Sequence, residues 1–69
     1  MHYLDYREQS ENIKGKRIRC IEMKDDHPVP SETEGTIECV DDIGTIQVKW
    51  DNGSGLGLVQ GEDIYEILT

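Results

Sequence analysis

The stretch Thr45-Ile46-Gln47-Val48-Lys49-Trp50-Asp51-Asn52-Gly53-Ser54 decides the fold of this chain. Its first six residues alternate polar and apolar side chains, which is the period-two pattern of a strand with one buried face. The Asn52-Gly53 pair that follows is the strongest short hairpin signal, because a type I′ turn needs positive φ at both central residues. We therefore expect a strand over Thr45–Trp50 that ends in a tight type I′ turn.

Strand signals of the same kind continue on both sides of this stretch. The chain has no alanine, and isoleucine, valine and threonine recur in short runs that Gly, Asp and Asn interrupt. Besides Thr45–Trp50, the runs predict strands over Lys16–Met23, Thr36–Val40, Leu56–Val59 and Ile64–Leu68, with a twist or bulge after Cys20 in the first of them. Gly55 and Gly57 are expected where a side chain would crowd a neighbouring backbone as the fourth strand bends.

The connections between these strands predict the fold class. Asp41–Gly44 and Gly61–Asp63 have the composition of tight turns. Lys24–Glu34 is a long polar loop in which Pro28 and Pro30 exclude a regular central strand. Five short strands with one long first loop predict a mainly β protein, a small five-stranded SH3-like barrel over residues 15–69.

Residues 1–14 are predicted to form a separate N-terminal arm or short helix. Tyr3 and Tyr6 are three positions apart and would share one face of a helix. Two alternatives remain open for this aromatic pair. It docks the arm on the barrel, or it joins two copies of the chain into a homo-oligomer.

Composition excludes several classes of function. Leu, Ile, Val and Phe supply 16 of the 69 residues, just above the fraction of about a fifth below which a charged chain is expected to be disordered. No apolar run is long enough for a membrane span, and the N-terminus lacks the apolar core of a signal peptide, so we expect a cytoplasmic protein. The net charge of −8 argues against nucleic-acid binding, which needs Lys and Arg for phosphate, and favours a basic partner.

Two cysteines, Cys20 and Cys39, lie in predicted strands and form no CxxC pair. We expect both to be reduced and to behave as small core residues. A disulfide stays open if the two strands are adjacent. Zinc is not expected, because only two thiols and no paired histidines are present.

The chain resembles the domain-of-unknown-function 4314 family, small proteins encoded in bacterial genomes, phages and mobile elements. The matching segments are Gly15-Lys16-Arg17-Ile18, Ile21-Glu22-Met23, Asp25-Asp26 with Pro28 and Pro30, Gly35-Thr36-Ile37, the run from Val40 to Ser54, Leu56-Gly57-Leu58, the Gly61–Asp63 turn and Ile64–Leu68. The resemblance thus covers Gly15 to Leu68, and its most specific part is Trp50-Asp51-Asn52-Gly53-Ser54. One departure is Ser31-Glu32, where the resemblance predicts a Pro/Gly-type turn. It implies an SH3-like barrel and a phage or mobile-element setting, and it carries no known activity or catalytic residue.

Asp25-Asp26-His27 is the one segment where carboxylates and an imidazole crowd together. One interpretation is a cation site, since oxygen ligands suit calcium or magnesium and the imidazole extends the range to transition metals. The alternative is a solvated loop whose aspartates cap turns through hydrogen bonds to the backbone. We favour the second interpretation, so neither a metal nor a cofactor is expected.

Trp50, followed by Asp51, is the best candidate for recognition. SH3-like domains often hold an extended peptide in an aromatic groove beside the long first loop. Pro28-Val29-Pro30 would then line that groove or act as such a ligand. The alternative interpretation places Trp50 in the core, because it alternates in phase with Ile46 and Val48, and makes Asp51 a turn-former.

No pattern of catalytic residues is present. His2 falls in the arm and His27 in a loop, and neither belongs to a Ser-His or Cys-His motif. The glycines at 53, 55 and 57 lack the lysine and the strand–loop–helix context of a phosphate-binding loop. We therefore expect a protein that is not an enzyme.

The sequence predicts a non-enzymatic SH3-like module that binds a protein partner. If the Asp41-Asp42 turn and the long loop lie near each other, they form one anionic patch, and we expect this patch to contact the partner in preference to the Arg17–Arg19 strand. The predicted partner-binding residues are Asp25, Asp26, Asp41, Asp42, Trp50 and Asp51. Alternatives are an acidic inhibitor that mimics nucleic acid on a basic surface of a host enzyme, and an oligomer that binds a small molecule or nucleotide.

Overall fold

The chain forms one helix and five strands within residues 5–68, the part that this computed structural model describes. In chain order they are α1 (Tyr6–Ile13), β1 (Arg17–Glu22), β2 (Glu34–Val40), β3 (Thr45–Trp50), β4 (Leu58–Val59) and β5 (Ile64–Ile67). The strands pair antiparallel in a single sheet of order β4-β3-β2-β1-β5. The prediction of a mainly β fold with five strands and a short helix is confirmed.

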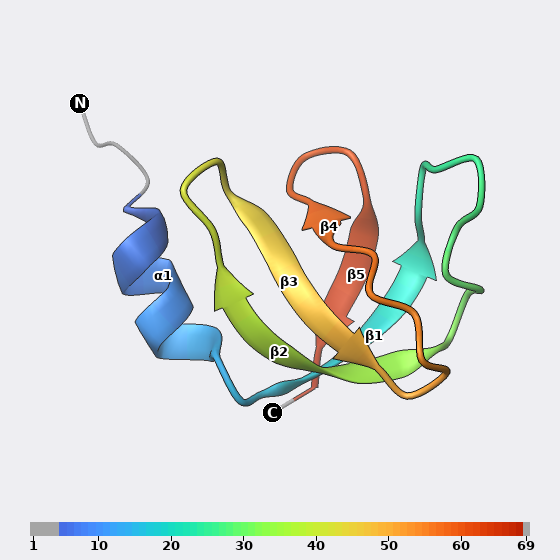
Figure 1. The fold of residues 1–69 in the computed structure, drawn as a ribbon, viewed down its shortest axis with the longest axis horizontal. Coiled ribbons are helices and arrows are strands. Elements are labelled where there is room, and N and C mark those ends of the chain that lie inside the picture. Colours follow the sequence, from blue (N-terminus) through green and yellow to red (C-terminus); the bar gives the residue numbers. More distant parts are fainter. Residues whose placement is uncertain (1–4, 69) are drawn as a thin grey trace.

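The sheet is strongly curled, and its two edge strands β4 and β5 are consecutive in the chain (Figure 1). Two bulges accompany the curl, one between Cys20 and Glu22 and one between Ile37 and Cys39. Bulges increase local twist and bend the strand that carries them. No hydrogen-bonded ladder joins β4 to β5 among the described residues, so the sheet is not closed and the word barrel describes it only approximately.

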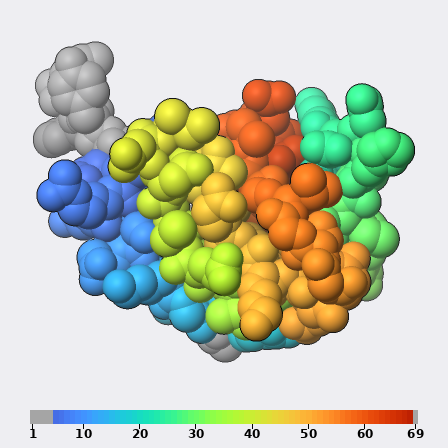
Figure 2. Space-filling model, in the orientation of Figure 1, coloured from blue at the N-terminus to red at the C-terminus, as the bar shows by residue number. Residues whose placement is uncertain are grey.

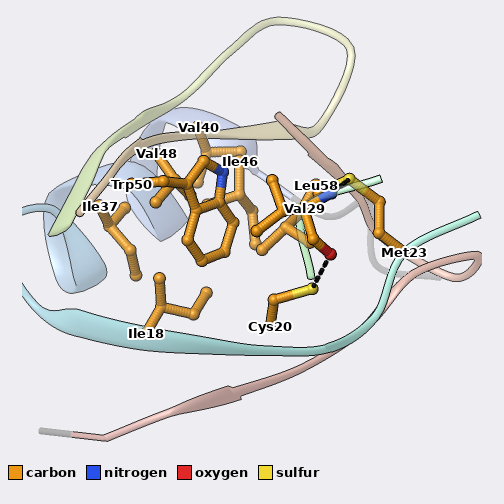
Figure 3. Close-up of a cluster of buried hydrophobic side chains, with 10 residues drawn as sticks. All are labelled: Ile18, Cys20, Met23, Val29, Ile37, Val40, Ile46, Val48, Trp50 and Leu58. Carbon is orange, nitrogen blue, oxygen red and sulfur yellow. Dashed lines mark hydrogen bonds between the residues drawn. The ribbon is translucent and has the colours of Figure 1, made fainter. Parts of the chain in front are cut away.

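The hydrophobic core fills the concave side of the sheet. Its ten buried residues are Ile18, Cys20, Met23, Val29, Ile37, Val40, Ile46, Val48, Trp50 and Leu58 (Figure 3). Trp50 lies among them with 2% of its surface exposed, and its indole Nε1–H donates to the carbonyl oxygen of Leu56 at 2.7 Å. The core interpretation of Trp50 is therefore confirmed.

The fourth strand is shorter than predicted. Leu56 is half-buried and lies outside β4, because its carbonyl accepts the indole N–H of Trp50 before the chain joins the sheet. Gly57 meets the expectation of crowding, since a Cβ there would lie 2.5 Å from Thr45 Cγ2. Gly55 does not, because a Cβ there would have nothing within 4 Å.

The turn after β3 differs from the predicted type I′ turn. Gly53 has φ 90°, but Asn52 is not among the described residues with positive φ. The Gly53 N–H donates to the Trp50 carbonyl at 3.0 Å, and the Asn52 side chain accepts from the Ser54 N–H at 2.9 Å. A type I′ turn is required only where two strands continue directly into each other, and here an irregular segment separates the turn from β4.

Helix α1 covers one end of the core beside β2 (Figure 1). Asp5 caps its N-terminus by accepting from the N–H groups of Arg7 and Glu8. Ser10 is buried, and its Oγ accepts from the Val40 N–H at 2.9 Å. The Tyr6 ring lies so close to Gly44 that a Cβ there would be 2.5 Å from Tyr6 Cζ. Docking through Tyr6 is thus observed, whereas the prediction for Tyr3 falls outside the described residues.

The two cysteines are free and far apart. The Cys20 N–H donates to the Thr33 carbonyl, so Thr33 lies beside Cys20 on the neighbouring segment. Cys39 follows Thr33 by six residues, which at the rise of an extended strand separates the two by roughly 20 Å. A disulfide needs Cα atoms within about 7 Å, so these two residues cannot be bridged in this fold. Cys20 is a core residue as predicted, but the bulge at Ile37/Cys39 turns Cys39 to a half-buried position.

The long loop returns to the sheet through a strained turn at the position where the sequence departs from the family pattern. Glu32 has φ 74° and is the one described non-glycine residue with positive φ. The Thr33 N–H donates to the Pro30 carbonyl at 3.2 Å, and the Glu32 N–H donates to the Cys20 carbonyl. The turn therefore forms without the glycine that its geometry favours.

Replacing Glu32 with glycine is expected to stabilise the protein by about 0.5 kcal/mol. The left-handed conformation costs an L-residue about 1 kcal/mol, and glycine's greater freedom in the unfolded chain cancels part of that gain. Glu32→Gln is the matched control, because it removes the same charge and keeps the strain. Urea unfolding should rank Glu32→Gly above Glu32→Gln; the reverse order would contradict the strained turn.

Candidate partner-binding surface

Three connections stand at the same end of the sheet, which we call the loop end (Figure 1). They are the first part of the long β1–β2 loop (residues 23–28), the β2–β3 turn (41–44) and the β4–β5 turn (60–63). The rest of the long loop (29–33) runs back beside β1 to the start of β2. The β3–β4 connection points the opposite way. The loop end carries the carboxylates Asp25, Asp26, Asp41, Asp42, Glu62 and Asp63.

The two acidic segments predicted to form one patch do not meet directly. The long loop joins the end of β1 to the start of β2, whereas the β2–β3 turn leaves the far end of β2. Figure 2 shows them at the two upper corners of the molecule, with the β4–β5 turn between them. The condition for a single patch of Asp25, Asp26, Asp41 and Asp42 is therefore not met, and Glu62 lies on the connection that separates the two clusters.

Asp41 holds the β2–β3 turn together. Its Oδ1 accepts from the N–H groups of Thr45 at 2.8 Å and Ile43 at 3.1 Å, and its Oδ2 accepts from Gln47 Nε2 at 3.0 Å. These bonds, led by the one from Thr45, lower the pKa of Asp41, which keeps the carboxylate ionised. Asp41 thus has a structural role, whatever else it contacts.

The carboxylates of the long loop are differently placed. Asp25 accepts from the His27 N–H at 2.9 Å, which is the turn-capping arrangement that the sequence favoured. Asp26 is exposed. No group of three or more His, Cys, Asp or Glu side chains within residues 5–68 is arranged to hold a metal ion.

Asp51 belongs to a different surface. It begins the β3–β4 connection, which points away from the loop end (Figure 1). Arg17 Nη1 donates to its Oδ1 at 3.1 Å. Arg17 and Arg19 also pair with Glu34, and Arg19 pairs with Glu66 at 3.0 Å. We call these five residues, which alternate in sign on the outer face of β1, the charge ladder. The charge of Asp51 is therefore paired with Arg17 at the protein surface and contributes nothing to an anionic loop end.

The bond from Arg17 also lowers the pKa of Asp51, and the carboxylate partners raise the pKa values of both arginines. All five side chains are 35–57% exposed, so the ladder adds little stability. The ladder instead affects the distribution of charge, because two of the seven Lys and Arg side chains form ion pairs with three carboxylates.

The two candidates for an aromatic or proline groove differ in exposure, because Trp50 is buried whereas Pro28 and Pro30 are not. The Trp50 ring is buried, as described above, so it cannot present a face to a partner in this conformation. Val29 is 3% exposed and anchors the long loop in the core, with Cys20 Sγ 3.5 Å from its carbonyl oxygen. Pro28 and Pro30 are exposed on either side of this anchor.

Several residues that shape the loop end are absent from the sequence-based prediction. Gln9 and Gln60 exchange two amide hydrogen bonds of 2.9 Å, and Gln60 Nε2 also donates to the Gly44 carbonyl at 2.8 Å. Asp63 is buried and binds two backbone N–H groups. No local pattern marks these contacts, because the Gln9–Gln60 pair spans 51 positions of sequence.

The sequence-based prediction also leaves out Ile43, which is 81% exposed at the tip of the β2–β3 turn. A signal for it was present, since an isoleucine stands in a turn otherwise composed of aspartate and glycine. Beside it is a shallow depression lined by Asp5, Tyr6, Arg7 and Asp42.

Helix α1, the one helix that the structure describes, is too short and too polar to cross a membrane.

A family model described as "Domain of unknown function (DUF4314)" matches residues 7–68. The chain matches no curated protein and no solved structure. Because the match covers nearly the whole sequence, the chain belongs to the DUF4314 family.

Proposed function

We propose that this member of the DUF4314 family is a non-enzymatic, SH3-like binding module that holds a basic protein partner through its loop end. The observation that carries the proposal is the segregation of charge. On the outer face of β1, Arg17 and Arg19 pair with all three carboxylates of the charge ladder. At the loop end six carboxylates stand against the single cation Lys24. Asp26, Asp42 and Glu62 are exposed there and form no ion pair with any described residue.

A basic partner follows from this distribution. Unpaired carboxylates on one end of a molecule repel phosphate and anionic surfaces and attract a surface rich in Lys and Arg. The charge would speed association and set specificity more than it would set affinity. The proposed phage or mobile-element setting rests on the family resemblance alone, and the proposed cytoplasmic location rests on the sequence pattern.

Catalysis is not part of the proposal. Burial, followed by the charge of Asp63, raises the pKa of the Cys20 thiol, which makes it a poor nucleophile at neutral pH. The phenol of Tyr65 also has a raised pKa because of burial.

The test is capture from a bacterial lysate with two matched triple variants. Asp26→Asn/Asp42→Asn/Glu62→Gln removes three negative charges from the loop end. Glu11→Gln/Glu32→Gln/Glu38→Gln removes three exposed carboxylates that lie away from the loop end and has the same net charge. Asp41 is left intact because it holds its turn together.

The proposal predicts that the wild-type chain captures a basic protein at low salt and releases it at high salt. The loop-end variant should lose most of this capture, and the control variant should keep it. Equal capture by both variants would overturn the proposal. If the captured protein is a nucleic-acid enzyme that DNA displaces, the binding module acts as a nucleic-acid mimic.

A further inference from the structure

The tip of the β2–β3 turn displays an apolar side chain where turn chemistry does not call for one. Ile43 is 81% exposed, whereas the other exposed large hydrophobic residues of the described chain range from 38% to 51%. Turn positions favour Asp, Asn, Gly and Ser because these residues bond their own backbone or tolerate positive φ. A single exposed isoleucine is ordinary on a protein surface, so its exposure alone decides nothing.

The turn that carries Ile43 is held rigidly from three sides. The Asp41 side chain accepts one hydrogen bond from the turn and two from β3, as described above, and the Gly44 N–H closes the turn on the Asp41 carbonyl at 3.0 Å. Gln60 binds the Gly44 carbonyl from the β4–β5 turn. The Tyr6 ring packs against Gly44 from α1. Ile43 is thus a pre-organised projection, and such a group loses little conformational entropy when it is buried by a partner.

The depression beside the turn complements this projection. Asp5 and Asp42 contribute two carboxylates to its lining, and Tyr6 contributes an aromatic ring. A lysine or arginine side chain placed there would meet both negative charges and the ring. Arg7 also lines the depression and opposes a second cation.

We propose that Ile43 and the depression lined by Asp5, Tyr6, Arg7 and Asp42 form one docking surface. Its occupant is a protein with an apolar pocket for Ile43 and a Lys or Arg at the pocket rim for the depression. The inference rests on the proposed function and places the contact with the partner at one of the three connections of the loop end, the β2–β3 turn. A second copy of this chain is a poor occupant, because each copy has a net charge of −8 and would bring the same carboxylates to the contact.

Four single variants of the full chain test the docking surface. The probe is the basic protein that the wild-type chain captures from lysate, used after purification. Ile43→Ser should weaken its binding at least about tenfold, as loss of a buried anchor does. Ile64→Ser, which removes an equally large apolar side chain that is 51% exposed on β5, should bind like wild type. Thermal unfolding of Ile43→Ser should match wild type, because serine suits the turn; if it does not, Ile43→Asn replaces it.

The remaining pair tests the depression through a gain of binding, which misfolding cannot produce. Arg7→Gln removes the opposing cation and should tighten binding severalfold. Lys49→Gln makes the same charge change on the exposed face of β3 and should tighten it less. The inference is overturned if Ile43→Ser binds as well as Ile64→Ser, or if Arg7→Gln binds no more tightly than Lys49→Gln. Either result leaves the proposed function standing as long as the loop-end triple variant loses capture of the basic protein. If the wild-type chain captures no basic protein, the proposed function and the inference both fail.

Discussion

Replacing Gly35 with alanine is expected to lower the free energy of unfolding by about 3 kcal/mol. A Cβ at this buried position of β2 would lie 2.7 Å from Val48 Cγ1, 2.8 Å from the Lys49 carbonyl oxygen and 2.9 Å from Trp50 Cα. The valine methyl group can rotate away, but the other two atoms belong to the backbone of β3. Gly35 pairs directly with Trp50, so relief of the clash must separate β2 from β3.

Urea unfolding measures this effect, and Gly55→Ala is the control. Gly55 is not among the described glycines with positive φ, and the space where its Cβ would lie is open, so alanine there should leave stability unchanged or raise it slightly. A domain of this size gains only about 3–5 kcal/mol from its core, so Gly35→Ala should be largely unfolded at body temperature. Similar stabilities for the two variants would contradict the close approach of β2 and β3.

Replacing Asp63 with alanine is expected to cost about 3 kcal/mol as well. The buried carboxylate accepts from the Lys24 N–H at 2.7 Å through Oδ1 and from the Val59 N–H at 2.8 Å through Oδ2. It therefore links the start of the long loop to β4, a strand that pairs only with β3 among the described residues. Alanine would leave two backbone donors without this acceptor, and bonds to a charged group are each worth about 1.5–3 kcal/mol.

Asp63→Asn and Glu62→Ala separate the causes of this loss. Asparagine keeps the shape and one acceptor but turns an N–H₂ group toward the second donor, so it should fall between wild type and alanine. Glu62 is the exposed neighbour, and its removal should change stability by less than about 0.5 kcal/mol. Stability of Asp63→Ala within about 1 kcal/mol of wild type would show that the carboxylate does not hold the fold's open side.

Local sequence pattern was sufficient for the elements whose burial alternates regularly. Thr45–Trp50 alternates without interruption, and β3 has those bounds. Thr36–Val40 was predicted two residues short at its start, because the pairing of Glu34 with Arg19 depends on a neighbouring strand. The bulge in β2 and the exposure of Cys39 also depend on how β3 pairs, and no periodicity within β2 indicates them.

The candidate site was predicted only at the level of residue type. Acidic turns at Asp25-Asp26 and Asp41-Asp42 could be identified because they interrupt the strand pattern. Their separation, and the pairing of Asp51 with Arg17 across 34 positions, follow from strand order, which a single sequence does not contain. The contribution of α1 to the docking surface has the same origin, since it requires Tyr6 to lie against Gly44.

The distribution of charge, more than its total, is the central claim about function. The most direct measurement is the change in backbone amide chemical shifts when the isotopically labelled full chain is titrated with the purified basic partner. The account predicts the largest changes at Asp26, Asp42, Ile43 and Glu62, with the amides of Arg17 and Arg19 in the charge ladder unchanged. Changes concentrated on the outer face of β1 would contradict it.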